Sequence, residues 1–386
     1  MIFRKYSLLS VYLYKLCQYL FGIFSDISLQ LHEGRVIYHP YTKREHPMNA
    51  GQQQIAVNGV HIGVIEHGKR GNPPLVLLHG FTGSAASWGT LLTDLAAYQS
   101  RSNKPPTSPQ GTHKGCPYDG TDTPRRPLPT IVEASLVGAL GGAGDLFERD
   151  WAAHNLHVIA LDMLGHGQSA APTDPARYSI EHCQTDIIAV LQSLGIRSGE
   201  AILLGYSMGG RIALYCAFSG FFRALILESA SPGLAHPLER VQRHQSDMAL
   251  ADRIEREGIP AFVAYWEQLP LFASQRSLPK EKQATLHAQR LHNRATGLAN
   301  SLRGIGTGIQ PALHAQLPTL TIPVLLITGE LDTKFCALAE QMQQALPLAQ
   351  WSVMPGAGHA VHLEQAALFV RDVAGFCRSV VDKPCM

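Results

Sequence analysis

The chain has 386 residues, of which 45% are hydrophobic and 16% are charged, and its formal net charge is +2. This is the composition of an ordinary globular protein, and it argues against a disordered or fibrous chain. The near balance of charge, without a dense run of lysine and arginine, argues against a nucleic-acid partner.

The seven cysteines are scattered, and none of them forms a Cys-x-x-Cys pair. Such a pattern suits a reducing compartment and offers neither a disulfide framework nor a zinc site. We therefore expect a cytoplasmic protein without a metal site.

Residues 1–53 form an N-terminal extension ahead of the first clear domain pattern. Within it, segment 6–24 is rich in apolar and aromatic residues, yet Lys15 lies at its centre, where a charge is costly inside a bilayer. No small-residue cleavage site follows, so a secretory signal is not supported. An interfacial helix, an uncleaved anchor and a segment outside the functional protein stay open, as does a translation start at Met48. Membrane contact is expected only through this extension.

The β pattern begins with segments 55–57 and 60–66 on either side of an Asn-Gly pair at 58–59. That pair is a strong signal for a two-residue hairpin turn. A continuous apolar run at 74–78 then predicts a buried strand, and helical periodicity follows at 84–97.

Residues 98–153 interrupt this rhythm with Pro, Gly, Ser, Thr and basic residues, and a loop of that length is abnormal in a compact core. Asp-Leu-Ala-Ala at 94–97 resembles Asp-Trp-Ala-Ala at 150–153, so removing the span between them rejoins a helix end to a strand at 157–162. We interpret 98–153 as a disordered insertion that is not catalytic. A helix-to-strand connection lies where strands begin, far from a site at their carboxyl ends.

Short apolar segments then alternate with helical ones, which predicts a mostly parallel sheet with helices on both faces. Residues 231–317 carry helical patterns and several aromatic residues, and we expect them to form a helical cap over the strand ends that encloses a pocket. The core domain is accordingly expected at 54–230 and 318–382. The predicted strands are 158–162, 201–206, 224–228, 324–328 and 350–354, and the predicted helices are 179–194 and 208–219.

The most informative segment is a Gly-x-Ser-x-Gly sequence at 205–209, at the end of an apolar run. A serine between glycines at a strand-to-helix turn is a nucleophile elbow, because the small residues let the backbone reverse without a clash. The hydroxyl of Ser207 then projects above the sheet, and the N–H of Met208 lies beside any oxyanion that forms. We expect the second N–H of an oxyanion hole from Phe81.

A serine needs an adjacent imidazole, and the imidazole needs an acid that fixes its tautomer. Asp332 follows the strand predicted at 324–328, and His359 follows a glycine-rich turn after the last strand. The order Ser, Asp, His is that of the α/β-hydrolase fold. The alternatives left open are His362, expected to begin the next helix, in place of His359, and Glu228 or Glu330 in place of Asp332.

Six strings of the sequence together resemble the 2-succinyl-6-hydroxy-2,4-cyclohexadiene-1-carboxylate synthase (MenH) family of menaquinone and phylloquinone biosynthesis. The similarity covers about residues 54–380 without the insertion. It implies a carbon–oxygen lyase that eliminates pyruvate from 2-succinyl-5-enolpyruvyl-6-hydroxy-3-cyclohexene-1-carboxylate and uses no cofactor. The strings are LVLLHGFTGS, ALDMLGHGQSA, LLGYSMGGRIALY, TGLANSLRGIGTG, LLITGELDTKF and PGAGHAVHLE.

The resemblance implies that Ser207 acts as a base on the carbon α to the succinyl ketone, while the Phe81 and Met208 amides hold the enolate oxygen. The small substrate carries several carboxylates, which arginine binds in bidentate fashion. Arg211 lies four residues after Ser207 and therefore on the same helix face. By resemblance, the cap arginines are Arg243 and Arg290, with Trp266 and Tyr206 lining the pocket; the neighbouring Arg240 and Arg294 stay open as alternatives.

Two other functions remain open at this point. The same triad performs acyl transfer to water, so a serine hydrolase of an ester or a C–C bond is the first alternative. A catalytically silent binding scaffold is the second. The arginine set argues against the hydrolase, and an intact Ser207, Asp332 and His359 argue against the scaffold. The sequence does not give the oligomeric state or the open and closed positions of the cap.

Overall fold

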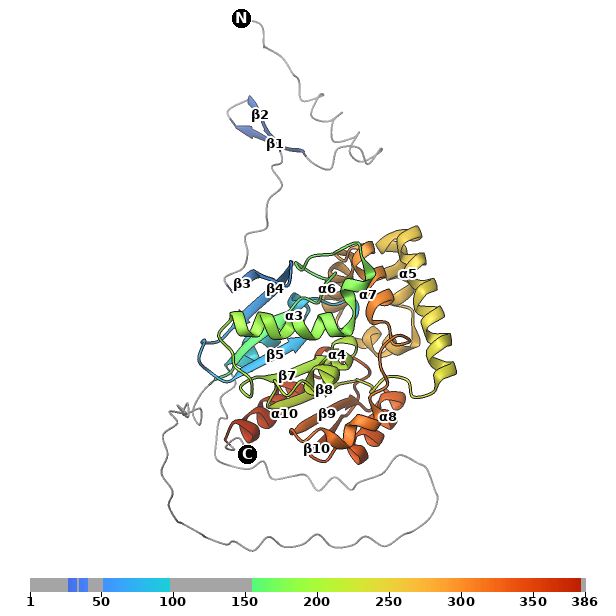
Figure 1. The fold of residues 1–386 in the computed structure, drawn as a ribbon. Coiled ribbons are helices and arrows are strands. Elements are labelled where there is room, and N and C mark those ends of the chain that lie inside the picture. The colour runs from blue at the N-terminus through green and yellow to red at the C-terminus, as the bar shows by residue number, and fades with distance from the viewer. Residues whose placement is uncertain (1–26, 33–34, 41–50, 98–154, 383–386) are drawn as a thin grey trace, which may run out of the picture. The chain divides into compact units, whose positions relative to one another are not determined.

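The computed structural model describes residues 27–32, 35–40, 51–97 and 155–382. The chain divides into two compact units, residues 1–53 and 54–386 (Figure 1). Segment 6–24, Met48 and the insertion at 98–153 lie outside the described residues.

The first unit contains a two-stranded antiparallel sheet of β1 (Ile27–His32) and β2 (Arg35–Pro40). Ile27 pairs with Pro40, and His32 pairs with Arg35. No strand is predicted here from the sequence. The missed signal is the alternation of apolar and polar residues in ISLQLH.

The larger sheet has eight strands in the order β10-β9-β8-β7-β5-β6-β4-β3. The strands from β5 to β10 pair in parallel, whereas β4 pairs with β6 antiparallel, which confirms the mostly parallel sheet. Both turn residues at 58–59 have a positive φ, as the predicted hairpin requires. The strands are β3 (Gln52–Val57), β4 (Val60–His67), β5 (Pro74–Leu78), β6 (His157–Leu161), β7 (Ile202–Tyr206), β8 (Ala224–Glu228), β9 (Val324–Gly329) and β10 (Ala349–Met354).

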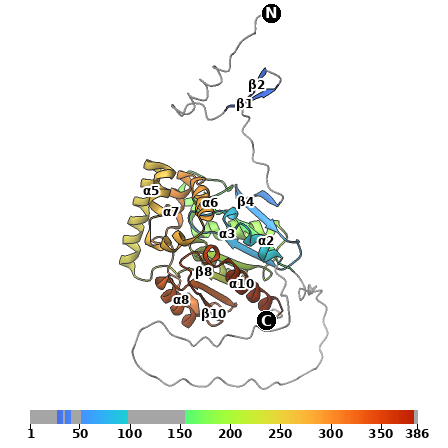
Figure 2. The ribbon, with the colours of Figure 1, turned by 180° about the vertical axis from the view of Figure 1, so that it is seen from behind.

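Helices cover both faces of this sheet, because successive strand side chains point to opposite sides. Val76 and Leu78 belong to one hydrophobic cluster, and Leu75 and Leu77 belong to another. Figures 1 and 2 show the helices from the two sides. The first cluster includes residues of α3 (Ile180–Ser193), α4 (Met208–Ala217) and α8 (Thr333–Ala345), and the second includes residues of α2 (Leu91–Ala96) and α10 (Ala366–Val381).

One predicted helix is divided in the structure. The segment 84–97 forms a 3-10 turn, η1 (Ala85–Trp88), followed by the short helix α2. Gly89 lies between them with φ 52° and ψ −130°, a backbone conformation that ends a helix. The prediction of one continuous helix was therefore wrong, since the apolar periodicity continues across a glycine that breaks the backbone.

A helical segment is inserted between β8 and β9. Its longest helix, α5 (Pro237–Trp266), is kinked at Gly258, where φ is 78° and ψ is 172°. The apolar side chains of Phe262 and Val263 pack in one cluster with Leu298, which belongs to a later helix of the segment. The remaining elements here are η3 (Pro270–Ser277), α6 (Lys280–Leu291), α7 (Ala295–Ile305) and η4 (His314–Thr319); η2 (Pro175–Tyr178) and α9 (Val361–Glu364) lie elsewhere in the unit.

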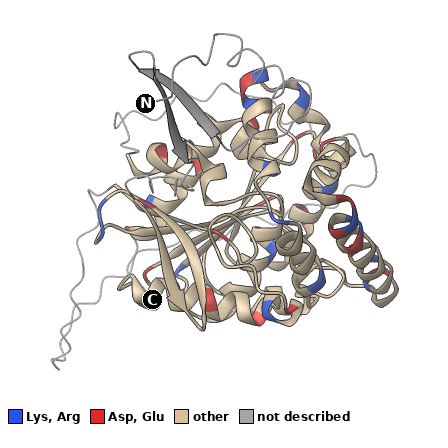
Figure 3. Cartoon of the chain, turned by 90° about the horizontal axis from the view of Figure 1, so that it is seen from above, with Lys and Arg blue, Asp and Glu red and all other residues tan. Residues whose placement is uncertain are grey.

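Charges of both signs are interspersed along the helices (Figure 3). Arg303 of α7 pairs with Asp252 and Glu255 of α5, at 2.7 Å in each case, so ion pairs join these two helices on their exposed side. Within the described ranges, none of the helices combines the length and the apolar character that crossing a bilayer requires.

Candidate active site

Ser207 stands at the turn between β7 and α4 with φ 52° and ψ −106°. This conformation is rare for a residue with a side chain, and it is the one that projects the hydroxyl of a nucleophile elbow. The N–H of Ser207 donates a hydrogen bond of 2.9 Å to the carbonyl of Glu228 on the neighbouring strand. The strained turn is thus fastened to the sheet at its centre.

Three glycines make the turn sterically possible. A Cβ on Gly205 would meet the backbone of Gly209, and a Cβ on Gly209 would meet the carbonyl oxygen of Leu78. A Cβ on Gly210 would lie 2.6 Å from that of Ala230, so this third glycine is required as well. Ser207 can occupy its position because these three glycines leave room for the neighbouring backbone and for the side chain of Ala230.

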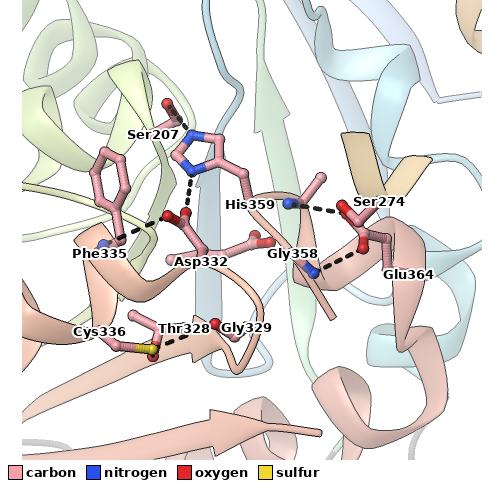
Figure 4. A network of polar contacts seen from close by, with 12 residues as sticks. Ser207, Ser274, Thr328, Gly329, Asp332, Phe335, Cys336, Gly358, His359 and Glu364 are labelled. Atoms are coloured by element: carbon pink, nitrogen blue, oxygen red, sulfur yellow. Dashed lines mark hydrogen bonds and ion pairs between the residues drawn. The ribbon is translucent and has the colours of Figure 1, made fainter. Parts of the chain in front are cut away.

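The structure brings Ser207, His359 and Asp332 together in one hydrogen-bonded line (Figure 4). His359 Nε2 lies 2.9 Å from Ser207 Oγ, and His359 Nδ1 lies 2.7 Å from Asp332 Oδ2. The backbone N–H of Phe335 donates to Asp332 Oδ1 at 3.4 Å, and its ring centroid lies 4.6 Å from that of His359. This arrangement can move a proton from the serine hydroxyl to the imidazole.

The alternative residues do not take part in this line. Glu228 Oε1 lies 2.8 Å from His362 Nδ1, so these two form a separate buried pair. Glu330 accepts a hydrogen bond from the Gly356 N–H and is exposed. The geometry therefore selects Asp332 as the carboxylate that contacts His359.

The loop that carries His359 is held by Glu364, a residue that our sequence analysis did not consider. Glu364 accepts hydrogen bonds from the Gly358 N–H at 2.7 Å and from the Ser274 hydroxyl at 3.0 Å (Figure 4). Since Ser274 belongs to η3, the inserted helical segment contacts the histidine loop directly. The signal lay in the string PGAGHAVHLE, whose last residue is this glutamate.

The loop after β5 is held from behind by two buried histidines. His79 Nε2 accepts the N–H of Met163 at 3.0 Å, so Nδ1 carries the proton and donates to the Gly80 carbonyl at 2.7 Å. His166 Nε2 lies 2.6 Å from the Phe81 carbonyl oxygen. Burial lowers the pKa of both histidines to about 4, so both are neutral at pH 7. The Phe81 loop is therefore fixed by uncharged hydrogen bonds.

A cavity of about 880 Å³ lies between the carboxyl ends of the strands and the inserted helices. On the strand side it is lined by Ser207, His359, Tyr206, Phe81 and Met208. Burial raises the pKa of Tyr206 well above its usual range, so this phenol stays protonated. On the helical side the lining includes Trp266, Arg243 and Arg290.

Arg211 lies on α4 one turn from Ser207 and lines the same cavity. Its guanidinium donates to the Ile305 carbonyl at 3.2 Å and contacts the side-chain oxygen of Gln310. Burial and the neighbouring Arg243 lower the pKa of Arg211 to about 10, so it remains a cation at neutral pH. A positive charge held by uncharged partners can bind an anionic substrate group.

The two arginines predicted for the cap are distinguished from the neighbouring arginines by their position. Arg243 and Arg290 line the cavity, whereas Arg240 and Arg294 are not among the residues that line it. Arg243 pairs with Asp247 at 2.7 Å and keeps 46% of its side chain exposed. Arg290 is buried and donates to Glu267 at 3.0 Å and to Gln275 at 2.8 Å.

Several polar residues of the cavity were not predicted. No motif marks those on α5, α6 and η3, because it is the folding of the inserted helices that brings them to the site; Lys334 instead belongs to α8 and lies in the string LLITGELDTKF. Among the described residues, no group of three His, Cys, Asp or Glu side chains is arranged to hold a metal ion. The unpredicted polar lining residues include Gln242, Ser246, Gln275, Gln289 and Lys334.

Comparisons with known proteins agree with this geometry. A family model described as the alpha/beta hydrolase fold matches residues 136–366. A Bacillus subtilis (strain 168) protein, provisionally named 2-succinyl-6-hydroxy-2,4-cyclohexadiene-1-carboxylate synthase, is 36% identical over 333 residues, which are 86% of this chain and 100% of that protein. The synthase of that name from Serratia proteamaculans (strain 568) is 35% identical over 56% of this chain and 82% of its own length.

Solved structures show the same likeness. The structure of MenH from S. aureus has a TM-score of 0.63 and 28% identity, and the match covers 82% of this chain and 98% of that chain. The enol-lactonase from Burkholderia xenovorans LB400 has a TM-score of 0.59 and 20% identity, over 84% of this chain and 99% of that chain. At that identity the second likeness is one of fold alone.

Proposed function

This chain belongs to the 2-succinyl-6-hydroxy-2,4-cyclohexadiene-1-carboxylate synthase family, within the α/β-hydrolase fold, and we propose that it is a carbon–oxygen lyase of menaquinone biosynthesis. Its reaction eliminates pyruvate from 2-succinyl-5-enolpyruvyl-6-hydroxy-3-cyclohexene-1-carboxylate. The observation that carries the proposal is the line from Ser207 through His359 to Asp332 at the base of an arginine-lined cavity.

Ser207 acts as the base of this reaction. His359 Nε2 takes the hydroxyl proton, and Ser207 Oγ removes the hydrogen from the ring carbon that carries the succinyl group. The Asp332 carboxylate stabilises the imidazolium that forms and fixes its orientation, a contribution of the general-base kind that is worth about 10²- to 10⁴-fold in rate. The contact of 2.9 Å between Ser207 and His359 supports this first proton transfer.

The charge that develops on the succinyl ketone is held by two backbone amides, those of Phe81 and Met208. Both residues line the cavity beside Ser207. Met208 begins α4, whose N-terminal dipole favours a negative charge at this point. The two neutral histidines behind the Phe81 loop keep the loop in place through their contacts with the Gly80 and Phe81 carbonyls.

Arginines hold the carboxylates of the substrate. Arg211 lies one helical turn from Ser207, and its half-buried cation serves the anionic group nearest to the reacting carbon. Arg243 and Arg290 approach from the inserted helices, with Trp266 and Tyr206 as the apolar walls. A polyanionic substrate is the ligand that such a cavity fits.

The domain roles and the cellular location are part of the proposal. The inserted helices within 231–317 serve as a cap, since residues from α5, α6 and α7 line the cavity opposite the strand ends. The core consists of 54–230 and 318–382. A cytoplasmic location agrees with the scattered cysteines, which suit a reducing compartment.

The experiment is a coupled assay of pyruvate release by the purified full-length chain with the authentic enolpyruvyl substrate. We expect turnover by the wild type and loss of it in Ser207→Ala. A neutral p-nitrophenyl ester is assayed in parallel, because a hydrolase with the same triad would cleave it. Ester cleavage without pyruvate release would show that the protein is a serine hydrolase and not a lyase.

A further inference from the structure

A second buried pair of a histidine and a carboxylate lies beside the first. Glu228 ends β8 with none of its surface exposed, and His362 stands in α9 with 5% exposed. His362 Nδ1 lies 2.8 and 2.9 Å from the two oxygens of Glu228, and the His362 backbone N–H donates to Glu228 as well, at 2.9 Å. The carboxylate thus holds Nδ1, as Asp332 does for His359.

This second pair belongs to the same cavity. The ring of Tyr206 lies between the two histidines, with its centroid 5.5 Å from that of His359 and 4.7 Å from that of His362. His362 lines the cavity, and its Nε2 makes no hydrogen bond to any residue that the structure describes. The Glu228 carbonyl also accepts the N–H of Ser207, so the pair is tied to the elbow itself.

The proposed reaction requires a proton donor in addition to the base. In its substrate the succinyl group is on ring carbon 2 and the enolpyruvyl group on ring carbon 5, and the product is a 2,4-diene. The hydrogen and the leaving group therefore depart from opposite ends of a four-carbon unit. A base placed at carbon 2 is not placed at the leaving group, which must itself gain a proton to become pyruvate.

We propose that His362, held by Glu228, is the acid that protonates the departing enolpyruvyl group. This inference rests on the proposed lyase function. The electron pair of the broken C–H bond forms the double bond between carbons 2 and 3, the ring double bond moves to carbons 4 and 5, and the bond from carbon 5 to oxygen breaks. As that bond breaks, its electron pair forms the carbonyl of pyruvate, and the methylene carbon of the leaving group takes the Nε2 proton of His362, so that pyruvate itself departs.

The proton balance closes without another reactant. The proton removed from carbon 2 rests on the Ser207–His359 pair. His362 enters the proposed step protonated on both ring nitrogens and ends neutral, with its Nδ1 proton still donated to Glu228. Exchange with solvent restores both histidines for the next turnover. No water is consumed, and no electron acceptor is needed.

A purely positioning role for His362 is separated from acid catalysis by measuring two rates in D₂O. One is pyruvate release, and the other is deuterium incorporation at carbon 2 of recovered substrate, which reports the first proton transfer alone. His362→Asn keeps a side-chain N–H near the Nδ1 position for Glu228 but has no group at Nε2. Glu228→Gln keeps the shape of the partner and removes its charge.

We expect pyruvate release to fall by about 10²-fold in His362→Asn, the scale of a lost general acid, with a smaller fall in Glu228→Gln. Deuterium incorporation should continue, because the enolate of the succinyl ketone returns to substrate when the leaving group is not protonated. The ratio of deuterium incorporation to pyruvate release should therefore rise by roughly tenfold or more. Thermal unfolding checks that each variant is folded. If His362→Asn is unfolded, Glu228→Gln carries the test.

The matched control is His157→Asn. His157 is also buried, at 2% exposed, and its Nε2 lies 2.7 Å from Glu66, but it begins β6 and is not among the residues that line the cavity. The ratio of deuterium incorporation to pyruvate release in His157→Asn should equal that of the wild type. The acid role alone would be overturned if deuterium incorporation and pyruvate release fell equally in His362→Asn, or if this variant released pyruvate at the rate of the wild type. If the wild-type protein itself released no pyruvate, the lyase function would be overturned as well.

Discussion

The two ends of the parallel strands carry similar chemical groups with different surroundings. At the carboxyl ends, His359 contacts Asp332 through Nδ1 and reaches Ser207 through Nε2. At the start of β6, His157 contacts Glu66 through Nε2, and neither residue lines the cavity. We therefore expect a buried histidine–carboxylate pair not to be catalytic by itself. What matters is whether the second ring nitrogen faces a reacting group.

The largest expected effects lie at the carboxyl ends. Ser207→Ala and His359→Ala should each lower the rate of pyruvate release by at least about 10²-fold, because each removes the proposed general base. Steady-state assays with the enolpyruvyl substrate measure this. His157→Asn serves as the control and should keep the wild-type rate once its folded fraction is taken into account. A near-normal rate in Ser207→Ala would remove the triad mechanism.

Arg211 should give the next largest effect. Arg211→Ala should lower kcat/KM by about 10²-fold, since a buried charge-assisted contact to the substrate is lost. Arg211→Lys should recover part of that loss, because it restores the charge without the planar fork. With a pKa of about 10, Arg211 should impose no change of activity between pH 6 and 8.

Arg240→Ala is the matched control for this arginine. Arg240 lies on α5 and is not among the residues that line the cavity. The same kcat/KM measurement should give a value close to that of the wild type. If Arg240→Ala and Arg211→Ala lost activity equally, the loss would reflect the general charge of the protein, and the assignment of Arg211 to a substrate carboxylate would be abandoned.

Much of the carboxyl-end site was predictable because local sequence marks it. The glycines around Ser207 are needed for steric reasons, and the Gly-x-Ser-x-Gly motif already indicates them. The apolar runs before Asp332 and His359 place both residues beyond strand ends. The structure brings these three residues into contact. Periodicity also predicted the eight strands of the larger sheet and, among the helices on its faces, α3 and α4.

What the sequence did not predict are the contacts between distant segments. Glu228 and His362 are 134 positions apart, and Ser274 and Glu364 are 90 apart, so no spacing rule joins them. The sequence pointed to Asp332, but excluding Glu228 as the alternative required knowing which histidine each carboxylate contacts. The break of helix 84–97 at Gly89 was missed for a different reason, since periodicity reports which side chains are apolar and not where the backbone turns.

The pair at the start of the strands should affect stability and leave activity unchanged. Partial burial favours a raised pKa for Glu66, but hydrogen bonds from His157 and Arg70 outweigh it and lower the pKa to about 2, from an ordinary value of 4.5. A lowered folded-state pKa stabilises the fold above pH 4.5, and this contribution is lost as the pH falls toward 2. Glu66→Gln has no such group to titrate.

Thermal or urea unfolding across this pH range measures the effect. Wild type should be more stable than Glu66→Gln at pH 6, and the difference should shrink steadily as the pH is lowered from about 5 to about 2. The kcat of Glu66→Gln at pH 7 should match the wild type. A constant difference in stability at every pH would show that the Glu66 charge does not contribute, and a fall in kcat would end the contrast between the two ends of the strands.

The smallest effect is expected from removing residues 98–153. The described segments on either side of this span, α2 and β6, lie next to each other, because Leu95, Ala96 and Leu156 belong to one hydrophobic cluster. No described residue between Trp88 and Tyr206 lines the cavity, so the join lies away from the proposed chemistry. A deletion that connects residue 97 to residue 154 should therefore keep kcat and KM within about twofold of the wild type, as surface connections tolerate changes of length.

The deletion variant is compared with a second one in which a Gly-Ser linker of about ten residues replaces the same span, so that strain at the join is separated from loss of the sequence itself. Pyruvate release and thermal unfolding are measured on both. If both variants are folded and both lose activity, the span contributes to catalysis. The assignment of catalysis to the carboxyl ends of the strands alone would then be wrong. If only the direct join loses activity, the cause is the geometry between α2 and β6.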